Sequence, residues 1–155
     1  MAFGSSSKIF TSFITDCLNN TSALDLNADT INVALYGNTG TPDQTVASAN
    51  TAYNVSQWTS TNEVTATGWT AGGLSLASVT STFSSATYTF DAADKAGGAS
   101  DTVTAAYGVL IYDDTIATPV ADQGICYLAF GGSNSVTSGT FTVSFNASGI
   151  FTVAV

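Results

Sequence analysis

Carboxylates are almost the only side chains in this sequence that could carry catalytic chemistry. The chain has no histidine. A general base active near neutral pH would therefore need a carboxylate whose pKa is strongly shifted. Glu63 is the single glutamate, and a glycosidase-type pair would have to recruit Asp113 or Asp114. Because adjacent aspartates after a strand more often accept hydrogen bonds from local backbone amides, we expect no enzymatic activity and no catalytic residue.

Two further patterns could bind small ligands. Asp91, Asp94 and Asp101 could hold calcium from separate acidic loops, but their spacing does not match an EF-hand loop. The glycine-rich run from Gly68 to Gly73 lacks the lysine of a phosphate-binding loop and precedes a predicted strand rather than a helix. A tight turn is the better interpretation of that run. The sequence therefore predicts no metal site and no cofactor.

Three aromatic residues and two cysteines remain as candidates for a site. Tyr53, Trp58 and Trp69 lie in or beside a long Asn- and Thr-rich segment, where exposed rings could stack on sugars. Such rings more often fill a sheet edge or a subunit interface, so both interpretations stay open. Cys17 and Cys126 lack the spacing of metal ligands. Two free, buried thiols are favoured over a disulfide between them.

The charge composition excludes two classes of partner. The chain has two lysines or arginines against eleven acidic residues, for a net charge of -9. Nucleic acids and anionic lipids are bound through clustered basic side chains, and Lys8 and Lys95 are too few to form a cluster. No segment approaches the roughly 20 apolar residues of a membrane span. The first residues also lack the uniform apolar stretch of a secretory signal. We expect neither a nucleic acid nor a membrane partner.

One helix is predicted from Ser7 to Leu18, where apolar residues recur at the helical period. These residues are Ile9, Phe10, Phe13, Ile14, Cys17 and Leu18. The residues from Ser5 to Ser7 are candidate N-caps, and Asn19 with Asn20 is a plausible stop. This helix either packs on the sheet or forms an arm that docks on a neighbouring subunit.

The rest of the chain predicts β-structure. Strands are expected at residues 30–36, 74–83, 87–91, 102–112, 124–130, 141–145 and 151–155. A phase shift within 74–83 indicates a bulge, and residues 146–149 are expected to join the last two strands as a hairpin. Residues 37–62 form a long loop. The fold class is therefore mainly β, an antiparallel sandwich or barrel-like domain with one short N-terminal α-helix. We expect a single domain over residues 1–155, with 1–22 as its helical N-terminal segment.

The outward positions of these strands carry hydroxyls where soluble β-proteins usually carry charge. They are Thr87, Thr89, Thr102, Thr104, Thr140, Thr142, Ser144 and Thr152. Neutral hydroxyls cost less to desolvate than charges, so another subunit can cover such faces without burying unpaired ions. The pattern favours self-association or attachment to a lattice over a Thr-rich monomer.

Five blocks, in this order along the chain, resemble a group of small virion proteins of tailed bacteriophages. The blocks are LDLNADTINVALYG, NEVTATGWTAGGLSL, AAYGVLIYDDT, DQGICYLAFGG and GTFTVSFNASGIFTVAV. They cover most of residues 24–155 and resemble, among others, a glycine-rich "G-Y/W-x-x-G-G-x-x-L" and a strand "Y-x-V-I-Y-x-D-T". Many members carry Lys or Arg where this chain has Asp113, so no contact residue is carried over.

The resemblance implies a capsid decoration or minor capsid protein. Such proteins lie on the outside of the shell, often as trimers, and contact the major capsid protein. The expected partners are thus the major capsid protein and further copies of this chain, and the expected location is the capsid exterior after assembly in the host cytoplasm. A net negative charge fits a position away from packaged DNA. The alternative is a tail- or fibre-associated adhesin that binds host-surface glycan through Trp58, Trp69 and their neighbours.

Overall fold

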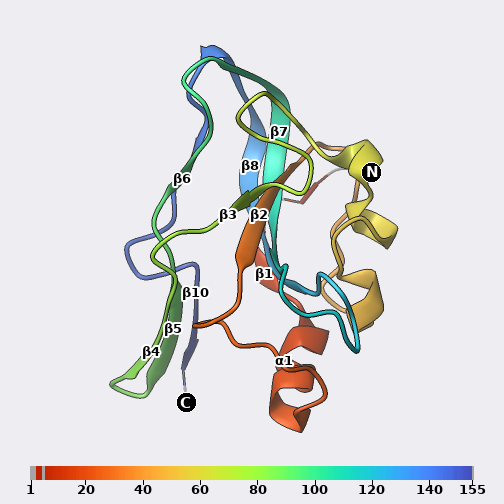
Figure 1. Ribbon diagram of the computed structural model, residues 1–155, viewed down its shortest axis with the longest axis vertical. Helices are drawn as coiled ribbons and strands as arrows, with labels where there is room; N and C mark the ends of the chain where they lie inside the picture. Colours follow the sequence, from red (N-terminus) through yellow and green to blue (C-terminus); the bar gives the residue numbers. More distant parts are fainter. Residues whose placement is uncertain (1–2, 5, 155) are drawn as a thin grey trace.

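Strands dominate the computed structural model, which describes residues 3–4 and 6–154 (Figure 1). Its one α-helix is α1 (Thr11–Asn19). The strands are β1 (Lys8–Ile9), β2 (Ile31–Tyr36), β3 (Leu74–Ser75), β4 (Thr80–Ser84), β5 (Thr87–Asp91), β6 (Lys95–Ala96), β7 (Asp101–Asp113), β8 (Gly124–Gly139), β9 (Thr142–Val143) and β10 (Phe151–Ala154). All pairings between these strands are antiparallel. The fold is mainly β and sandwich-like, as the sequence predicts; Ser5 and Val155 lie outside the described residues.

The largest sheet has the strand order β1-β8-β7-β2-β3, with the long strands β7 and β8 paired over most of their length. All six residues of β2 are buried. Alternation along the predicted strand 30–36 would place only Ile31, Val33 and Leu35 on a buried face. The opposite face of β2 is covered as well, because the Tyr36 ring packs against Trp58 with ring centroids 5.0 Å apart. Coverage of both faces explains why apolar residues outnumber polar ones in this central strand.

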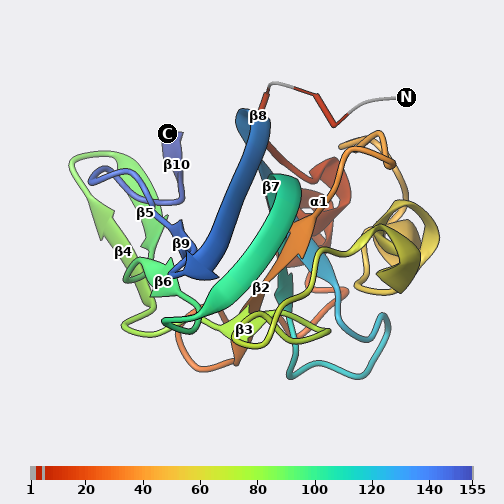
Figure 2. The ribbon, with the colours of Figure 1, turned by 90° about the horizontal axis from the view of Figure 1, so that it is seen from above.

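A second layer consists of two smaller sheets, β10-β5-β4 and β6-β9. Seen from above, the three-stranded sheet stands at an angle to β7 and β8 (Figure 2). The register places Phe90 of β5 opposite both Ser81 of β4 and Phe151 of β10, so these three side chains share one face. Phe90 is fully buried on that face. The inner face of the small sheet thus closes the hydrophobic core against the larger one.

The predicted helix starts later than its apolar pattern indicates. Lys8 and Ile9 pair with β8 as a strand, and the backbone N–H of Phe10 donates to the carbonyl of Ile125 at 3.1 Å. The sheet edge satisfies these backbone groups, so the prediction of helix for residues 7–10 is wrong. The helix ends as expected: Asn20 adopts a left-handed conformation with φ 51°, and its backbone N–H donates to carbonyls of the last turn.

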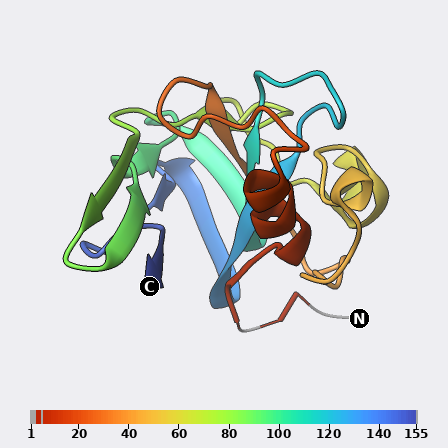
Figure 3. The ribbon, with the colours of Figure 1, turned by 90° about the horizontal axis from the view of Figure 1, so that it is seen from below.

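Helix α1 packs on the body of its own chain, which is the first of the two alternatives. Seen from below, it lies between the β4–β5 hairpin and the short helical turns (Figure 3). Phe13 is buried against Phe151, but Leu18 is 81% exposed. Cys17 is also exposed, so the prediction of two buried thiols is wrong for Cys17 and confirmed for Cys126. Within the described residues, no helix has the length and apolarity that crossing a bilayer requires.

Residues 37–62 contain three short 3-10 helices and no strand. These are η1 (Ser48–Asn50), η2 (Ser56–Trp58) and η3 (Ser60–Asn62). The segment covers one side of the large sheet instead of extending into solvent. Trp58 is its anchor, because its ring is 1% exposed and its backbone carbonyl accepts a hydrogen bond from the Tyr36 hydroxyl at 2.6 Å.

Two strand predictions are wrong in their pairing. Residues 74–83 do not form one bulged strand, because β3 joins the large sheet and β4 joins the small one. The last two strands do not form a hairpin with each other. A turn is present, with the Gly149 N–H donating to the Asn146 carbonyl at 2.8 Å, but β9 pairs with β6 and β10 pairs with β5. The predicted turn at residues 146–149 is therefore confirmed, but the two strands that flank it pair with strands far away in sequence.

Candidate partner-binding groove

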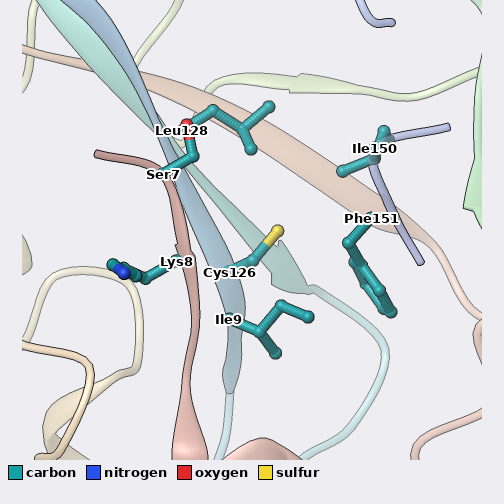
Figure 4. A pocket seen from close by; sticks show the side chains of 7 residues that line it. All are labelled: Ser7, Lys8, Ile9, Cys126, Leu128, Ile150 and Phe151. Carbon is teal, nitrogen blue, oxygen red and sulfur yellow. The ribbon is translucent and has the colours of Figure 1, made fainter. Parts of the chain in front are cut away.

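An apolar groove lies between strand β8 and the C-terminal strand β10. Its first part has a volume of about 310 Å³ and is lined by Ser7, Lys8, Ile9, Cys126, Leu128, Ile150 and Phe151. A second part of about 260 Å³ shares Ser7, Leu128 and Ile150, and adds the apolar Phe130, Val143 and Phe145 together with the polar Ser144 and Asn146. In Figure 4, Cys126 and Leu128 on one side approach Ile150 and Phe151 on the other. The two parts adjoin at their three shared residues and are together called the groove.

Two sheet edges form the walls of the groove. β1 pairs with β8 only at Tyr127 and Cys126, so among the described residues no strand covers the edge of β8 beyond them. The Ala129 N–H on that edge donates instead to the Ser7 hydroxyl at 3.0 Å. β10 is likewise an outer strand of its sheet. Uncovered strand edges next to apolar side chains are typical of surfaces that bind other protein.

Charge is nearly absent from the groove. Lys8 is the one charged residue that lines it, and its side chain points away from the sulfur of Cys126 and from Ile9 (Figure 4). Among the described residues, no Asp or Glu lines either part, although the chain carries eleven acidic residues. A partner can therefore fill the groove without burying an unpaired ion.

Cys126 does not bring thiol chemistry to the groove. Its residue is 1% exposed, and burial raises the pKa of its thiol far above the usual value. A thiol that stays protonated is a poor nucleophile and a poor metal ligand. Cys126 therefore acts as a small apolar residue in the wall.

The carboxylates that sequence reasoning considered for catalysis are not brought together. Glu63 accepts hydrogen bonds from the Tyr53 hydroxyl at 2.8 Å and from the Gly72 N–H at 2.9 Å. Burial raises the pKa of Glu63, and burial together with the nearby Glu63 carboxylate raises the pKa of Tyr53 to about 12. Asp113 accepts instead from the backbone N–H groups of Thr115 and Ile116. Each acid is engaged with its own local partners.

The three aspartates considered for calcium are likewise engaged separately. Asp101 is 1% exposed, and its two oxygens accept from the N–H groups of Gly68 and Gly98 at 2.6 and 2.7 Å. Asp94 accepts from the N–H of Phe145, and Asp91 from that of Ala92. Within residues 3–4 and 6–154, no group of three or more potential metal-ligating side chains is found. Asp101 instead ties the loop at Gly68 to the loop at Gly98.

The two tryptophans that could have stacked on sugars are core residues. Trp58 and Trp69 are each 1% exposed. The Trp69 indole N–H donates to the Phe141 carbonyl at 3.2 Å, and the residues around it form a tight turn, as expected. Tyr53 is half-buried and stacks on Tyr112 with ring centroids 5.1 Å apart. The less favoured interpretation, exposed rings that stack on sugars, is wrong for both tryptophans, because both side chains are buried in the core.

The hydroxyl-rich faces are largely where the strand pattern predicts them. Thr102, Thr104, Thr140, Thr142, Ser144 and Thr152 are exposed, and Thr87 and Thr89 are half-buried. Sequence reasoning missed the groove and the exposed ring of Phe83. The groove joins residues 7–9 to residues 126–151, and no local periodicity reports on such a long-range meeting. The placement of Phe83 in a strand otherwise made of Ser and Thr was the available signal.

No family model matches this chain, and no curated protein or solved structure shows significant similarity to it.

Proposed function

We propose that this chain is a non-enzymatic structural protein of a tailed-phage particle, which decorates the capsid by binding the major capsid protein and further copies of itself. The observation that carries the proposal is the groove, a largely apolar depression that no described Asp or Glu lines, on a molecule whose net charge is -9. The order of the five sequence blocks adds the phage assignment. The hydroxyl-rich faces provide further surface that can be desolvated cheaply.

The proposed mechanism is cementing of the shell. An apolar segment of the capsid protein would occupy the groove between β8 and β10, and burial of its surface would contribute about 25 cal/mol per Å² of apolar area. Strand edges on both walls offer backbone hydrogen bonds to an extended segment. Such contacts need no reacting group, which agrees with the local engagement of Glu63 and Asp113.

Co-sedimentation with particles tests this function. Shells that lack this protein are emptied of DNA and incubated with the purified chain. We expect saturable binding to the shells. We also expect shells with bound protein to disassemble at a higher temperature than bare shells. Binding to host envelope polysaccharide, with no binding to shells, would overturn the proposal in favour of an adhesin.

A matched pair of variants tests the groove itself. Ile150→Asp places a carboxylate in the groove, whereas Ala117→Asp adds the same charge at an exposed position of the loop between β7 and β8, outside the groove and the hydroxyl-rich faces. We expect Ile150→Asp to weaken binding to shells at least tenfold, because an unpaired charge would be buried in the complex. Ala117→Asp should bind like the unaltered chain. Ile150→Ser, which is uncharged, provides a milder second variant, and circular dichroism checks that each variant is folded.

A further inference from the structure

Strand β4 is an outer strand without the features that usually protect a sheet edge. It pairs with β5 alone, and it lies on the outside of the molecule (Figures 1 and 2). Its sequence, Thr80-Ser81-Thr82-Phe83-Ser84, contains no charge, proline or glycine. Natural edge strands are usually blocked by charged side chains, proline, bulges or covering elements. β4 is therefore open to pairing along its free side.

The edge is regular as well as open. Its pairing with β5 runs one-to-one from Thr80 opposite Asp91 to Ser84 opposite Thr87, with no bulge. The connecting residues Ser85 and Ala86 have φ values of 50° and 62°. Positive φ at both positions is typical of a type I′ turn, whose twist matches that of the strands. A regular five-residue edge presents its free backbone groups in the spacing that another strand requires.

Phe83 lies on the core-facing side of the small sheet, but its ring is not covered. The register places Phe83 on the same face as Tyr88 and Val153, and alternation places Phe90 and Phe151 on that face too. Phe90 is fully buried, but Phe83 is 64% exposed. The apolar inner face of the small sheet thus extends as far as β4, where the Phe83 ring is exposed to solvent.

We infer that β4 pairs antiparallel with β4 of a second copy of this chain, with Thr82 on the two-fold axis. This inference rests on the proposed function in one respect, namely that copies of the chain bind each other. Centring on Thr82 uses all five residues and places Thr80 opposite Ser84 and Ser81 opposite Phe83. The two Phe83 rings then lie on the same face as diagonal neighbours, within reach of each other across the new pair.

The charge distribution favours a second copy at this edge. Contact between two chains of net charge -9 costs least where carboxylates are absent. The nearest carboxylate along the hairpin is that of Asp91, opposite Thr80. In the paired arrangement the two Asp91 positions are separated by about 14 Å across the strands and about 13 Å along them, or about 20 Å. This separation is well beyond the screening length of about 8 Å at physiological salt.

Symmetry distinguishes this edge from the groove. An antiparallel pairing centred on one residue is its own complement, which is what a two-fold contact between identical chains requires. The groove joins two different strands, β8 and β10, and has no such internal symmetry. Of the other outer strands of the described residues, β10 is a wall of the groove, and β1, β3, β6 and β9 have two residues each, too few for stable pairing. β4 is thus the surface for self-pairing and the groove is the surface for a different partner.

Site-specific disulfide cross-linking tests the register. In a Cys17→Ser background, which removes the exposed thiol, Thr82→Cys should form a disulfide-linked dimer rapidly under mild oxidation, because residue 82 meets its own copy. Thr80→Cys is the matched control, since Thr80 faces Ser84 of the second copy. Equal cross-linking of the two variants would overturn the proposed register.

Analytical ultracentrifugation tests the dimer without cross-linking. Thr82→Lys places two like charges on the axis, whereas Ala117→Lys adds the same charge to an exposed loop position outside β4 and the hydroxyl-rich faces. We expect Thr82→Lys to raise the dimer dissociation constant at least tenfold and Ala117→Lys to leave it within twofold. An unaltered chain that stays monomeric at millimolar concentration, or equal effects of the two lysines, would overturn the inference.

The two proposals can fail separately. A chain that sediments with shells but is monomeric and does not cross-link through residue 82 would leave decoration standing and remove the β4 contact. A chain that pairs through β4 but does not bind shells would do the reverse.

Discussion

The buried carboxyl group of Asp113 lies beside the carboxyl group of Asp29 at the end of β7. Asp113 Oδ1 accepts from the N–H groups of Thr115 and Ile116, whereas its Oδ2 is buried without a hydrogen-bond partner among the described residues. Burial, together with the neighbouring Asp29, raises the pKa of Asp113 from 3.8 to about 6. Its surroundings therefore favour the protonated form of Asp113 over the carboxylate.

This pair predicts that the protein loses stability as the pH rises. The pKa of Asp113 is higher in the folded than in the unfolded chain, so its contribution is fully present below about pH 4 and is lost as the pH passes through about 6. We expect the free energy of unfolding, measured by urea denaturation, to fall between pH 5 and pH 8. A shift of one pKa unit corresponds to about 1.4 kcal/mol, so we expect the free energy of unfolding to fall by an amount of this order.

Asp113→Asn is the variant that isolates the pair. Its carbonyl can still accept from the two backbone N–H groups, and its amide places no charge in the buried position beside Asp29. The variant should match the unaltered chain at pH 5 and exceed it in stability at pH 8. Asp94→Asn removes a charge from an exposed aspartate and should leave the fall with pH unchanged. The idea fails if Asp113→Asn shows the same pH dependence as the unaltered chain.

Elements with a clear local pattern could be predicted from the sequence. Strand β5 matches its predicted bounds, and β7 and β8 begin within one residue of theirs, because alternation of apolar and polar residues needs no information from elsewhere in the chain. Helix α1 is right in its last two turns and in its stop at Asn20. Its first predicted turn is wrong because the edge of β8 competes for the backbone of Lys8 and Ile9.

Features that depend on distant pairing could not be predicted. β10 pairs with β5, about 60 residues earlier, although a turn at Asn146 offers β9 as the nearer partner. The burial of Trp58 and Trp69 depends on which faces the sheets present, and the composition around them left open whether they are exposed or fill an edge or interface. The groove has the same origin, since Ile9 and Ile150 come together only in the folded chain.

The two buried tryptophans predict different responses to the same substitution. The indole N–H of Trp58 is buried without a hydrogen-bond partner among the described residues, whereas that of Trp69 donates to the Phe141 carbonyl. Trp58→Phe removes an unsatisfied group and keeps an aromatic ring among Phe3, Phe10 and Tyr36. We expect Trp69→Phe to cost about 1 kcal/mol more than Trp58→Phe, as the loss of one buried hydrogen bond implies.

Urea denaturation followed by far-ultraviolet circular dichroism measures this difference without relying on tryptophan fluorescence. Trp58→Ala serves as the reference for a lost ring and should cost about 3–5 kcal/mol. If Trp58→Phe proves as destabilising as Trp58→Ala, the buried indole N–H of Trp58 does not destabilise the folded protein.

Gly73 and Gly131 share a backbone conformation but differ in their surroundings. Their φ values are +75° and +77°. A Cβ added at Gly73 would collide with the backbone carbonyl of Val33 in β2, whereas a Cβ at Gly131 would have no heavy atom within 4 Å. Gly73 therefore allows β3 to approach β2 closely. At Gly131 a side chain would be disfavoured only by the positive φ.

The pair separates torsional strain from steric collision. Gly131→Ala should cost about 1–2 kcal/mol, the usual penalty for a side chain in the left-handed region. Gly73→Ala adds overpacking of a central strand and should cost at least about 3 kcal/mol in total. Thermal unfolding of both variants measures the difference. Equal costs would mean that β3 can withdraw from β2 freely, and the close packing of Gly73 on Val33 would then contribute nothing to the stability of the large sheet.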